Sequence, residues 1–285
     1  ANGIRDILIA NQVVGPIKAR RFAARAHQAD GMCAVDSAAN VLEHQAAAKE
    51  AGTRPRIIIE VDTGMDRAGA RPGKEAVELA KLIAAQPDLR FAGFMTWEGH
   101  CMGIPDPVEK EAAIRASVGL LLDTVEEAEA AGLTVPVVSA GGTGTYLTTA
   151  SIEGVTEVQA GGAIFGDVAY RNLGIKVEPA LVVMTQVTSR PSDTKVIFDA
   201  GRKTIDPSNT QPHVRDLTID GPMRFSAEHG TMILAEPSDK PAVGDRLFLE
   251  SGYSDQLVHL HENFIGVRNG VVEAVLPILG RGRLQ

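Results

Sequence analysis

The chain has 285 residues, of which 44% are hydrophobic, and its 36 acidic and 28 basic residues give a formal net charge of −8. This apolar content excludes disorder as the main state of the chain. The acidic excess argues against a nucleic-acid partner, and no apolar run reaches the roughly 18 to 20 residues of a membrane helix. Two isolated cysteines exclude a disulfide framework and favour a cytoplasmic location.

Short apolar runs alternate with helical patterns over the first 175 residues. Each run has four or five residues without strict alternation, which is typical of parallel strands buried on both faces. The predicted strands are 6–10, 32–35, 57–61, 91–95, 135–138 and 157–160. The predicted helices are 16–27, 38–51, 74–85 and 108–131, with Ser37 as an N-cap and Gly52 and Gly132 at helix ends. The pattern predicts a parallel α/β structure.

The pattern changes after about residue 175, where short strands follow one another without long helices. The predicted strands are 180–190, 194–198, 223–226, 231–235, 246–250, 264–267 and 271–278. Asn269-Gly270 predicts a tight hairpin between the last two. We therefore predict an α/β domain at 1–175 and an all-β domain at 176–285. A closed (β/α) barrel needs eight parallel strands, two more than this pattern supplies, whereas an open doubly wound sheet can have six.

Small and polar residues follow several of the predicted strands. The segment Ser139-Ala-Gly-Gly-Thr-Gly-Thr-Tyr146 could close its backbone N–H groups on a phosphate, or could be only a glycine-rich turn. The stretch 159–167 could add further backbone donors. Arg67 could bind a ligand anion or form a loop salt bridge with Asp62 or Asp66. His100 is a candidate acid or base, with a purely structural role as the alternative.

The β domain contains a second group of polar residues. His259 and His261 alternate in a stretch that we predict to be a strand, so both would face one side. With Asp255 nearby they could hold a divalent ion, and the alternative is the solvated face of an edge strand.

In chain order, these motifs resemble the D-threonine aldolase and D-serine dehydratase family of fold-type III pyridoxal-phosphate enzymes. The matching stretches are 6–15, 60–69, 97–100, 139–146, 157–167, 199–203, 228–230 and 280–282, spread over essentially the whole chain. The resemblance implies an alanine-racemase-like (β/α)8 barrel followed by a C-terminal β domain, usually in a homodimer. It also implies that pyridoxal 5'-phosphate lies at the carboxyl ends of the strands.

The resemblance also suggests which residues serve the coenzyme. Ser139, Gly141, Gly142 and Thr143 look like the cradle for its phosphate, and Arg67 looks like the residue that reaches its phenolic oxygen. Gln12 and Tyr170 are further candidates for contact with the coenzyme.

Two departures from the family pattern stand out. The family's Schiff-base lysine, in a Pro-His-x-Lys-Thr setting, has no counterpart among the nine lysines of this chain. We therefore expect the first two βα units and that lysine to lie in an N-terminal segment of about 80 to 90 residues outside this sequence. Without that segment the chain alone should not be catalytic. The family's metal pair falls on Tyr253 and Asp255, and tyrosine is a poor ligand. Either the site is metal-free, or Asp255 binds Mg, Mn or Zn together with other groups such as His100.

The predicted activity is that of a pyridoxal-phosphate-dependent lyase acting on small D-amino acids. Retro-aldol cleavage of a D-3-hydroxy amino acid to glycine and an aldehyde is favoured, with His100 taking the β-hydroxyl proton. One alternative is a dehydratase acting on D-serine or D-3-hydroxyaspartate. Others are a racemase or decarboxylase on the same barrel, with Tyr253 as the base of the racemase, and a non-catalytic protein that binds the coenzyme.

Overall fold

The computed structural model describes residues 3–283. The chain divides into two compact units, with the boundary along the chain between Ala160 and Gly161. The outermost residues of the two predicted domains, 1–2 and 284–285, lie outside the described residues. Residues 161–175, which the sequence pattern groups with the α/β part, belong to the second unit and include the short helix α6 (Val168–Asn172).

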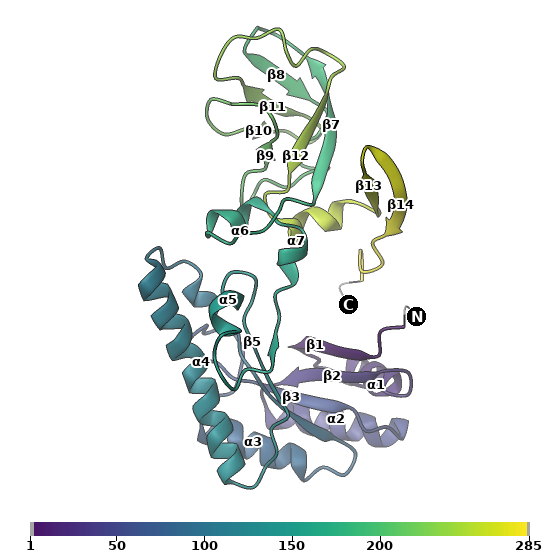
Figure 1. The fold of residues 1–285 in the computed structure, drawn as a ribbon. Helices are drawn as coiled ribbons and strands as arrows, with labels where there is room; N and C mark the ends of the chain where they lie inside the picture. The colour runs from purple at the N-terminus through teal and green to yellow at the C-terminus, as the bar shows by residue number, and fades with distance from the viewer. Residues whose placement is uncertain (1–2, 284–285) are drawn as a thin grey trace. The chain divides into compact units, whose positions relative to one another are not determined.

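The first unit is built on one parallel sheet whose strands follow one another in chain order (Figure 1). The strands are β1 (Asp6–Gln12), β2 (Asp30–Val35), β3 (Arg56–Glu60), β4 (Arg90–Met95), β5 (Val137–Ala140) and β6 (Glu157–Val158). The helices are α1 (Pro16–Arg25), α2 (Ala38–Ala51), α3 (Lys74–Ala84), α4 (Pro107–Ala130) and the short α5 (Tyr146–Thr149). A 3-10 turn, η1 (Gly99–Cys101), follows β4. The predicted parallel α/β structure is thereby confirmed.

Local chemistry explains where these helices begin and end. The Ser37 hydroxyl accepts a hydrogen bond from the Asn40 N–H at 3.4 Å, as an N-cap of α2 should. Gly52 ends that helix in the left-handed region, at φ 62°. The carboxylate of Asp106 caps α4 by accepting from two backbone N–H groups, each at 2.9 Å. The expected caps at Ser37 and Gly52 are therefore confirmed.

The central strands of this sheet are buried on both faces. Ile57 and Ile59 of β3 belong to the apolar layer between the sheet and its helices. Ile58, between them, belongs to a separate cluster with Met32, Ala34, Ala92 and Met95. All three isoleucines are fully buried, which explains why the apolar runs show no alternation of polar and apolar residues.

The second unit is an antiparallel β structure. One sheet has the order β10-β11-β8-β7-β12-β9, and a separate hairpin pairs β13 with β14. The strands are β7 (Val182–Ser189), β8 (Lys195–Phe198), β9 (His213–Val214), β10 (Arg224–Phe225), β11 (Gly230–Ile233), β12 (Arg246–Glu250), β13 (Asn263–Arg268) and β14 (Val271–Pro277). Asn269 (φ 52°) and Gly270 (φ 77°) form the predicted turn between the last two strands.

One predicted strand of this unit is wrong. The stretch that carries His259 and His261 is helical: α7 (Ser254–Leu257) is followed by the 3-10 turn η3 (Val258–Leu260). Ser254 and Leu257 are both buried, and their spacing of three residues fits a helical turn rather than a strand. The His261 ring is instead bonded to the carbonyl oxygen of Thr204 at 2.8 Å.

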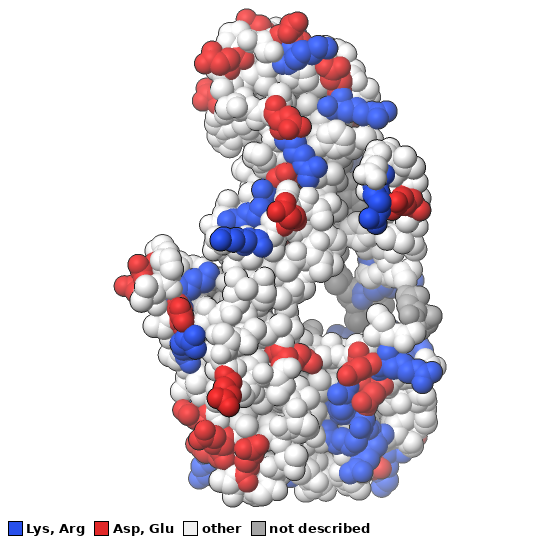
Figure 2. Space-filling model, viewed as in Figure 1, with Lys and Arg blue, Asp and Glu red and all other residues white. Residues whose placement is uncertain are grey.

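The surface of the first unit is unevenly charged. Figure 2 shows Lys and Arg gathered over α1 and α2 on the visible face, and Asp and Glu over α3 and α4. Helix α1 carries Lys18 and three arginines, but Arg20 pairs with Glu50 at 3.0 Å, and Arg56 on β3 pairs with Asp30 at 3.2 Å. No helix among residues 3–283 is long and apolar enough to cross a membrane.

Glu250, at the end of β12, is the buried carboxylate of a charged cluster in the second unit. It accepts hydrogen bonds from Arg171 and from Arg215, the latter at 2.9 Å, and lies 3.4 Å from Nδ1 of His213. Burial opposes ionisation of this carboxyl, but the two arginines outweigh it and hold the pKa of Glu250 below its usual value.

A substitution at Gly93 should destabilise the parallel sheet strongly. Gly93 lies at an irregularity of β4 with φ 139°, and a Cβ there would come within 1.9 Å of the carbonyl oxygen of Val137 on β5. We expect Gly93→Ala to lower the free energy of unfolding by about 2 kcal/mol or more in urea titrations. Gly119→Ala, within α4 and with open space at its Cα, should raise it by up to about 1 kcal/mol. Equal effects of the two changes would contradict this account.

The Glu250 cluster should make stability depend on acid. Because the pKa of Glu250 is lower in the folded state, the unfolded state takes up its proton first as the pH falls. The contribution to stability is therefore present above the usual carboxyl range and disappears as the pH drops through the lowered pKa. We expect Glu250→Gln to show a shallower decrease in the free energy of unfolding between about pH 5 and pH 3 than the parent protein. Identical slopes would contradict this assignment.

Candidate active site

The candidate active site of the first unit lies at the carboxyl edge of its parallel sheet. Carboxyl ends of parallel strands meet at one edge, which is where ligands bind in α/β folds. Gln12 ends β1, Glu60 ends β3 and Ser139 lies in β5, while Arg67 follows β3 in a loop. The topology therefore brings most of the predicted residues of this unit to the same edge.

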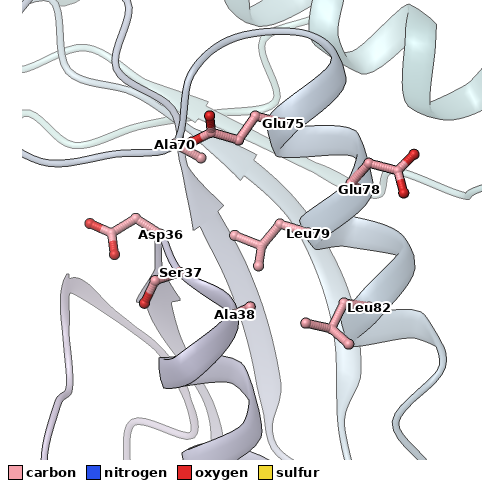
Figure 3. Close-up of a pocket in the computed structure, with 8 residues that line it drawn as sticks. All are labelled: Asp36, Ser37, Ala38, Ala70, Glu75, Glu78, Leu79 and Leu82. Atoms are coloured by element: carbon pink, nitrogen blue, oxygen red, sulfur yellow. The ribbon is translucent and has the colours of Figure 1, made fainter.

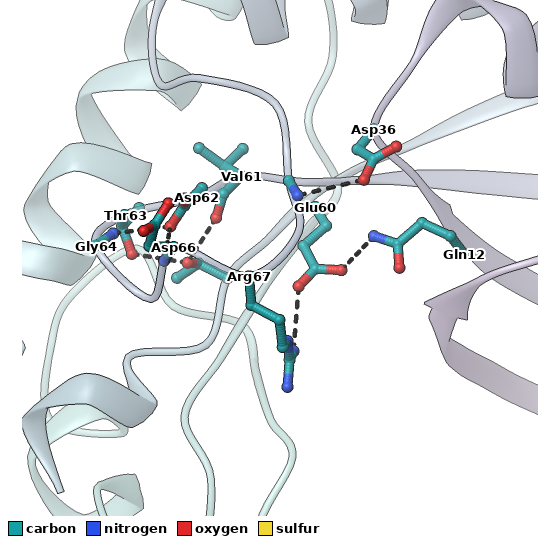
Figure 4. Close-up of polar contacts among 11 residues, drawn as sticks. Gln12, Asp36, Glu60, Val61, Asp62, Thr63, Gly64, Asp66 and Arg67 are labelled. Carbon is teal, nitrogen blue, oxygen red and sulfur yellow. Dashed lines mark hydrogen bonds and ion pairs between the residues drawn. The ribbon is translucent and has the colours of Figure 1, made fainter.

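Glu60 joins two of the candidates (Figure 4). Its buried carboxylate accepts a hydrogen bond from Nε2 of Gln12 at 2.5 Å and pairs with Nη2 of Arg67 at 3.4 Å. The alternative prediction, a salt bridge of Arg67 with Asp62 or Asp66, is therefore wrong. The Arg67 guanidinium also lies over the ring of Trp97, 4.9 Å from its centre. The side chain remains 52% exposed, so its charge is available to an anionic ligand.

His100 lies against the loop that follows β3. The Asp62 carboxylate shapes this loop by accepting from the N–H groups of Gly64 (3.0 Å) and Asp66 (3.1 Å). A Cβ at Gly64 would come within 2.8 Å of Nε2 of His100, so the imidazole covers this glycine. His100 is exposed, and no group within residues 3–283 hydrogen-bonds to its ring. Both ring nitrogens are therefore available to a ligand.

The glycine-rich segment follows β5, and hydrogen bonds to other protein groups fix its backbone. The N–H of Gly141 (φ 80°) donates to Glu98 at 3.1 Å, and the N–H of Gly142 donates to the Thr145 hydroxyl at 3.1 Å. Two of the predicted phosphate donors are thus already used, one by Glu98 in the segment after β4 and one by Thr145 within the turn. The Thr143 hydroxyl is buried and has no hydrogen-bond partner among the described residues. An unpaired buried hydroxyl of this kind is what a polar ligand would satisfy.

The Ser139 hydroxyl forms its hydrogen bonds with residues at the next strand of the sheet. Its hydroxyl donates to Glu157 at 2.7 Å and accepts from Nε2 of Gln159 at 2.9 Å. Because Ser139 is fully buried, these contacts tie β5 to the segment of β6. A direct contact between Ser139 and a phosphate would have to displace one of them.

The remaining candidates lie together in the second unit. The Tyr253 hydroxyl donates to Asp255 at 2.8 Å, and its ring centre lies 6.3 Å from that of Tyr170. Buried Asp167 holds both segments: it accepts from the N–H of Tyr170 at 3.1 Å and from the hydroxyl of Ser254 at 2.8 Å. Burial, and then the hydrogen bond to Asp255, raises the pKa of the Tyr253 phenol well above its usual value. Tyr253 is therefore a proton donor at neutral pH.

Asp255 stays a predicted metal ligand without a completed ligand set. Among the described residues, no group of three or more His, Cys, Asp and Glu side chains is arranged to hold a metal ion. The carboxylate of Asp255 instead accepts the Tyr253 hydroxyl.

A pocket of about 450 Å³ lies between the start of α2 and helix α3 (Figure 3). Its lining contains the carboxylates of Asp36, Glu75 and Glu78 together with Leu79 and Leu82. Carboxylates without an accompanying arginine or lysine would repel a phosphate. The pocket is therefore a poor site for a phosphorylated coenzyme.

Pyridoxal 5'-phosphate fits the residues at the sheet edge better. The buried, unpaired Thr143 hydroxyl and the half-exposed Arg67 cation match an anionic phosphate and an electron-rich ring oxygen. Gly142 lies so close to Trp97 that a Cβ would come within 2.6 Å of the indole Nε1, so a larger residue could not keep this turn. Thr143, Arg67, Gln12 and the turn at Gly142 therefore stay the predicted contacts of the coenzyme.

Three residues of this edge were not identified from the sequence: Glu60, Trp97 and Glu98. Glu60 carries a detectable signal, since it is a carboxylate at the end of an apolar run. Trp97 and Glu98 stand beside His100 in the same motif but have no pattern of their own. Their partners lie 30 to 51 positions away in the chain, so only the fold reveals them.

Comparison with known proteins gives family matches for both units. Residues 1–169 match the family described as "Alanine racemase, N-terminal domain", and residues 180–267 match the one described as "Putative serine dehydratase domain". A 3-hydroxy-D-aspartate aldolase of Paracoccus denitrificans (strain Pd 1222) is 31% identical over 291 residues, covering 99% of this chain and 75% of that protein. A D-threonine aldolase of Arthrobacter sp is 29% identical, covering 99% of this chain and 76% of that protein.

A solved structure gives the same result at the level of the fold. The crystal structure of D-threonine aldolase from Filomicrobium marinum has a TM-score of 0.92 at 28% identity, covering 99% of this chain and 78% of that one. The resemblance drawn from the motifs is confirmed, and so is the fold class of an alanine-racemase-like α/β part followed by a β domain.

The phenol of Tyr253 should ionise late in an alkaline titration. The chain has three tyrosines, so the difference between the ultraviolet titrations of the parent protein and Tyr253→Phe isolates one phenol. We expect that difference to show a step above the usual tyrosine pKa of about 10. Asp255→Asn removes the neighbouring charge and should move the step downward only part of the way, because burial remains. A step at or below about 10 in the parent protein would contradict the described environment.

Proposed function

Because this chain belongs to the alanine-racemase-like family of pyridoxal-phosphate-dependent D-amino acid lyases, we propose that it acts in the aldol cleavage of D-3-hydroxy amino acids. The reaction is the retro-aldol cleavage of the substrate to glycine and an aldehyde. The matched relatives carry the names of two such aldolases, which differ in the substrate side chain.

The observation that carries the proposal is the arrangement around Trp97. The guanidinium of Arg67 lies over its ring, Gly142 borders its indole nitrogen, and His100 follows it by three residues. A cation, an imidazole to which no described residue hydrogen-bonds, and a turn whose Thr143 hydroxyl has no partner among residues 3–283 thus belong to one edge of the sheet. These groups suit an anionic coenzyme and a proton transfer beside it.

Each of these residues has a definite task in the proposed reaction. Thr143 and the turn at Gly142 bind the coenzyme phosphate, and Arg67, oriented by Glu60, binds the ring of the coenzyme. When bound, pyridoxal phosphate accepts the electron pair released at Cα of the substrate. His100 takes the proton of the β-hydroxyl, so that the Cα–Cβ bond breaks and Cβ leaves as an aldehyde. A proton added to Cα then completes glycine.

A dehydratase is the second candidate, because residues 180–267 match a serine dehydratase domain. Such an enzyme removes the Cα proton and expels the β-hydroxyl as water, giving a keto acid and ammonia in place of glycine and an aldehyde.

The proposed function also includes an oligomeric state, a metal ligand and a cellular location. We infer a homodimer, as the family resemblance implies, and keep Asp255 as the candidate ligand of a divalent ion. We also infer a cytoplasmic location, with which two free and buried cysteines agree.

Product analysis tests the proposed reaction. The full-length protein, loaded with pyridoxal phosphate, is incubated with D-threonine and with 3-hydroxy-D-aspartate. We expect glycine and the matching aldehyde in equal amounts. Keto acid and ammonia would establish the dehydratase instead, and the absence of turnover with both substrates would favour the non-catalytic alternative.

The role of His100 can be tested separately. His100→Ala should lower kcat by about 100-fold to 10,000-fold, the usual contribution of a general base, and leave the affinity for pyridoxal phosphate unchanged. His27→Ala is the matched control: this exposed histidine of the first unit contacts the carbonyl oxygen of Ala51 and should be dispensable for turnover. Wild-type turnover in His100→Ala would remove this residue from the mechanism.

A further inference from the structure

Glu98 is a wholly buried carboxyl group at the sheet edge, in the segment that follows β4. No lysine, arginine or histidine within the described residues forms an ion pair with it. Burial of a carboxyl group without a cation is costly and is tolerated only where hydrogen bonds satisfy its oxygens. The identity of those hydrogen-bond partners therefore indicates what Glu98 does.

Both partners belong to the glycine-rich turn and the helix that follows it. One carboxyl oxygen accepts the N–H of Gly141 at 3.1 Å, and the other accepts the hydroxyl of Thr149, the last residue of α5. Gly141 also lies close to Thr149, because a Cβ at position 141 would come within 3.1 Å of Cβ of Thr149. Glu98 thus fastens the two ends of the segment to each other.

The segment between these two ends carries the unpaired Thr143 hydroxyl. The N–H of Gly142 is closed on Thr145, so the turn is shaped by contacts within the protein and needs no ligand to form. Preorganised donors bind an anion more tightly than donors that must first be ordered. The turn keeps this preorganised shape only while Gly141 and Thr149 stay fixed.

We propose that Glu98 is a positioning residue that holds the glycine-rich turn in the shape that receives the coenzyme phosphate. This inference rests on the proposed function, which places the phosphate at that turn. Glu98 acts through the hydrogen bonds to Gly141 and Thr149 and does not touch the ligand.

The two ways in which a carboxyl group could act there have opposite signs. A negative charge near the turn weakens phosphate binding by Coulomb repulsion, so its removal alone would strengthen binding. Hydrogen bonds that shape the turn strengthen phosphate binding, so their loss weakens it. In Glu98→Gln the amide oxygen can accept from Gly141 while the amide nitrogen donates to Thr149. The Thr149 hydroxyl can then donate to the carbonyl oxygen of Thr145, 3.3 Å away.

The experiment compares the binding of pyridoxal phosphate and of phosphate-free pyridoxal to the full-length protein by equilibrium dialysis. Glu98→Ala and Thr149→Val remove the two ends of the contact, whereas Glu98→Gln and Thr149→Ser keep it. We expect the first pair to lose about tenfold or more in affinity for pyridoxal phosphate with pyridoxal affinity unchanged. The second pair should bind both ligands as the parent protein does. Glu111→Ala, on the exposed face of α4, is the control for a lost carboxylate.

Several outcomes would overturn the inference. An equal loss of affinity for both ligands would mean that Glu98 merely supports the fold, and unchanged or stronger binding by Glu98→Ala would mean that it does not shape the turn. If Glu98→Ala does not fold, the Thr149→Val and Thr149→Ser pair decides in the same way. A parent protein that binds pyridoxal as tightly as pyridoxal phosphate would overturn the phosphate site of the proposed function together with this inference.

Discussion

Two buried carboxyl groups at the ends of neighbouring strands hold the loops of the candidate site together. Burying such a group is unfavourable unless hydrogen bonds satisfy it, so Glu60 and Glu98 each need partners from elsewhere in the chain. Glu60 takes them from Gln12 of β1 and from Arg67. Glu98 takes them from the segment after β5. The hydrogen bonds that satisfy these two carboxyl groups thereby connect the end of β1 with the segments that follow β3, β4 and β5.

Trp97 lies between the Arg67 side chain and two glycines of the neighbouring loops. Its ring faces the Arg67 guanidinium, and its edge borders the backbone of Gly99 and of Gly142. A bulky aromatic side chain can lie this close to two loops only where the loops lack side chains of their own. The glycine at position 142 is therefore explained by its neighbour Trp97 as much as by an approaching phosphate, a distinction that the glycine-rich pattern by itself does not make.

The features that could be predicted from the sequence are those that depend on nearby residues. Runs such as 57–61, the N-cap at Ser37 and the turn at Asn269-Gly270 are set by local composition, and the structure confirms them. The segment at His259 is helical although its pattern predicts a strand, because alternating apolar residues fit a short helical turn equally well. The partner of Arg67 could not be predicted, since Asp62, Asp66 and Glu60 are all near in sequence and only the fold decides between them. Glu98 has partners 43 and 51 positions away, a distance that no local pattern spans.

The environment of Tyr253 bears on the competing racemase mechanism. A tyrosine that acts as a base must lose its proton at the working pH, which requires nearby positive charge to lower its pKa. Here burial and the carboxylate of Asp255 both act in the opposite direction, and the phenol already donates its proton to that carboxylate. Asp167, which fixes Ser254 beside it, keeps the phenol in this arrangement. Burial and the hydrogen bond to Asp255 thus keep the Tyr253 phenol protonated in the structure described.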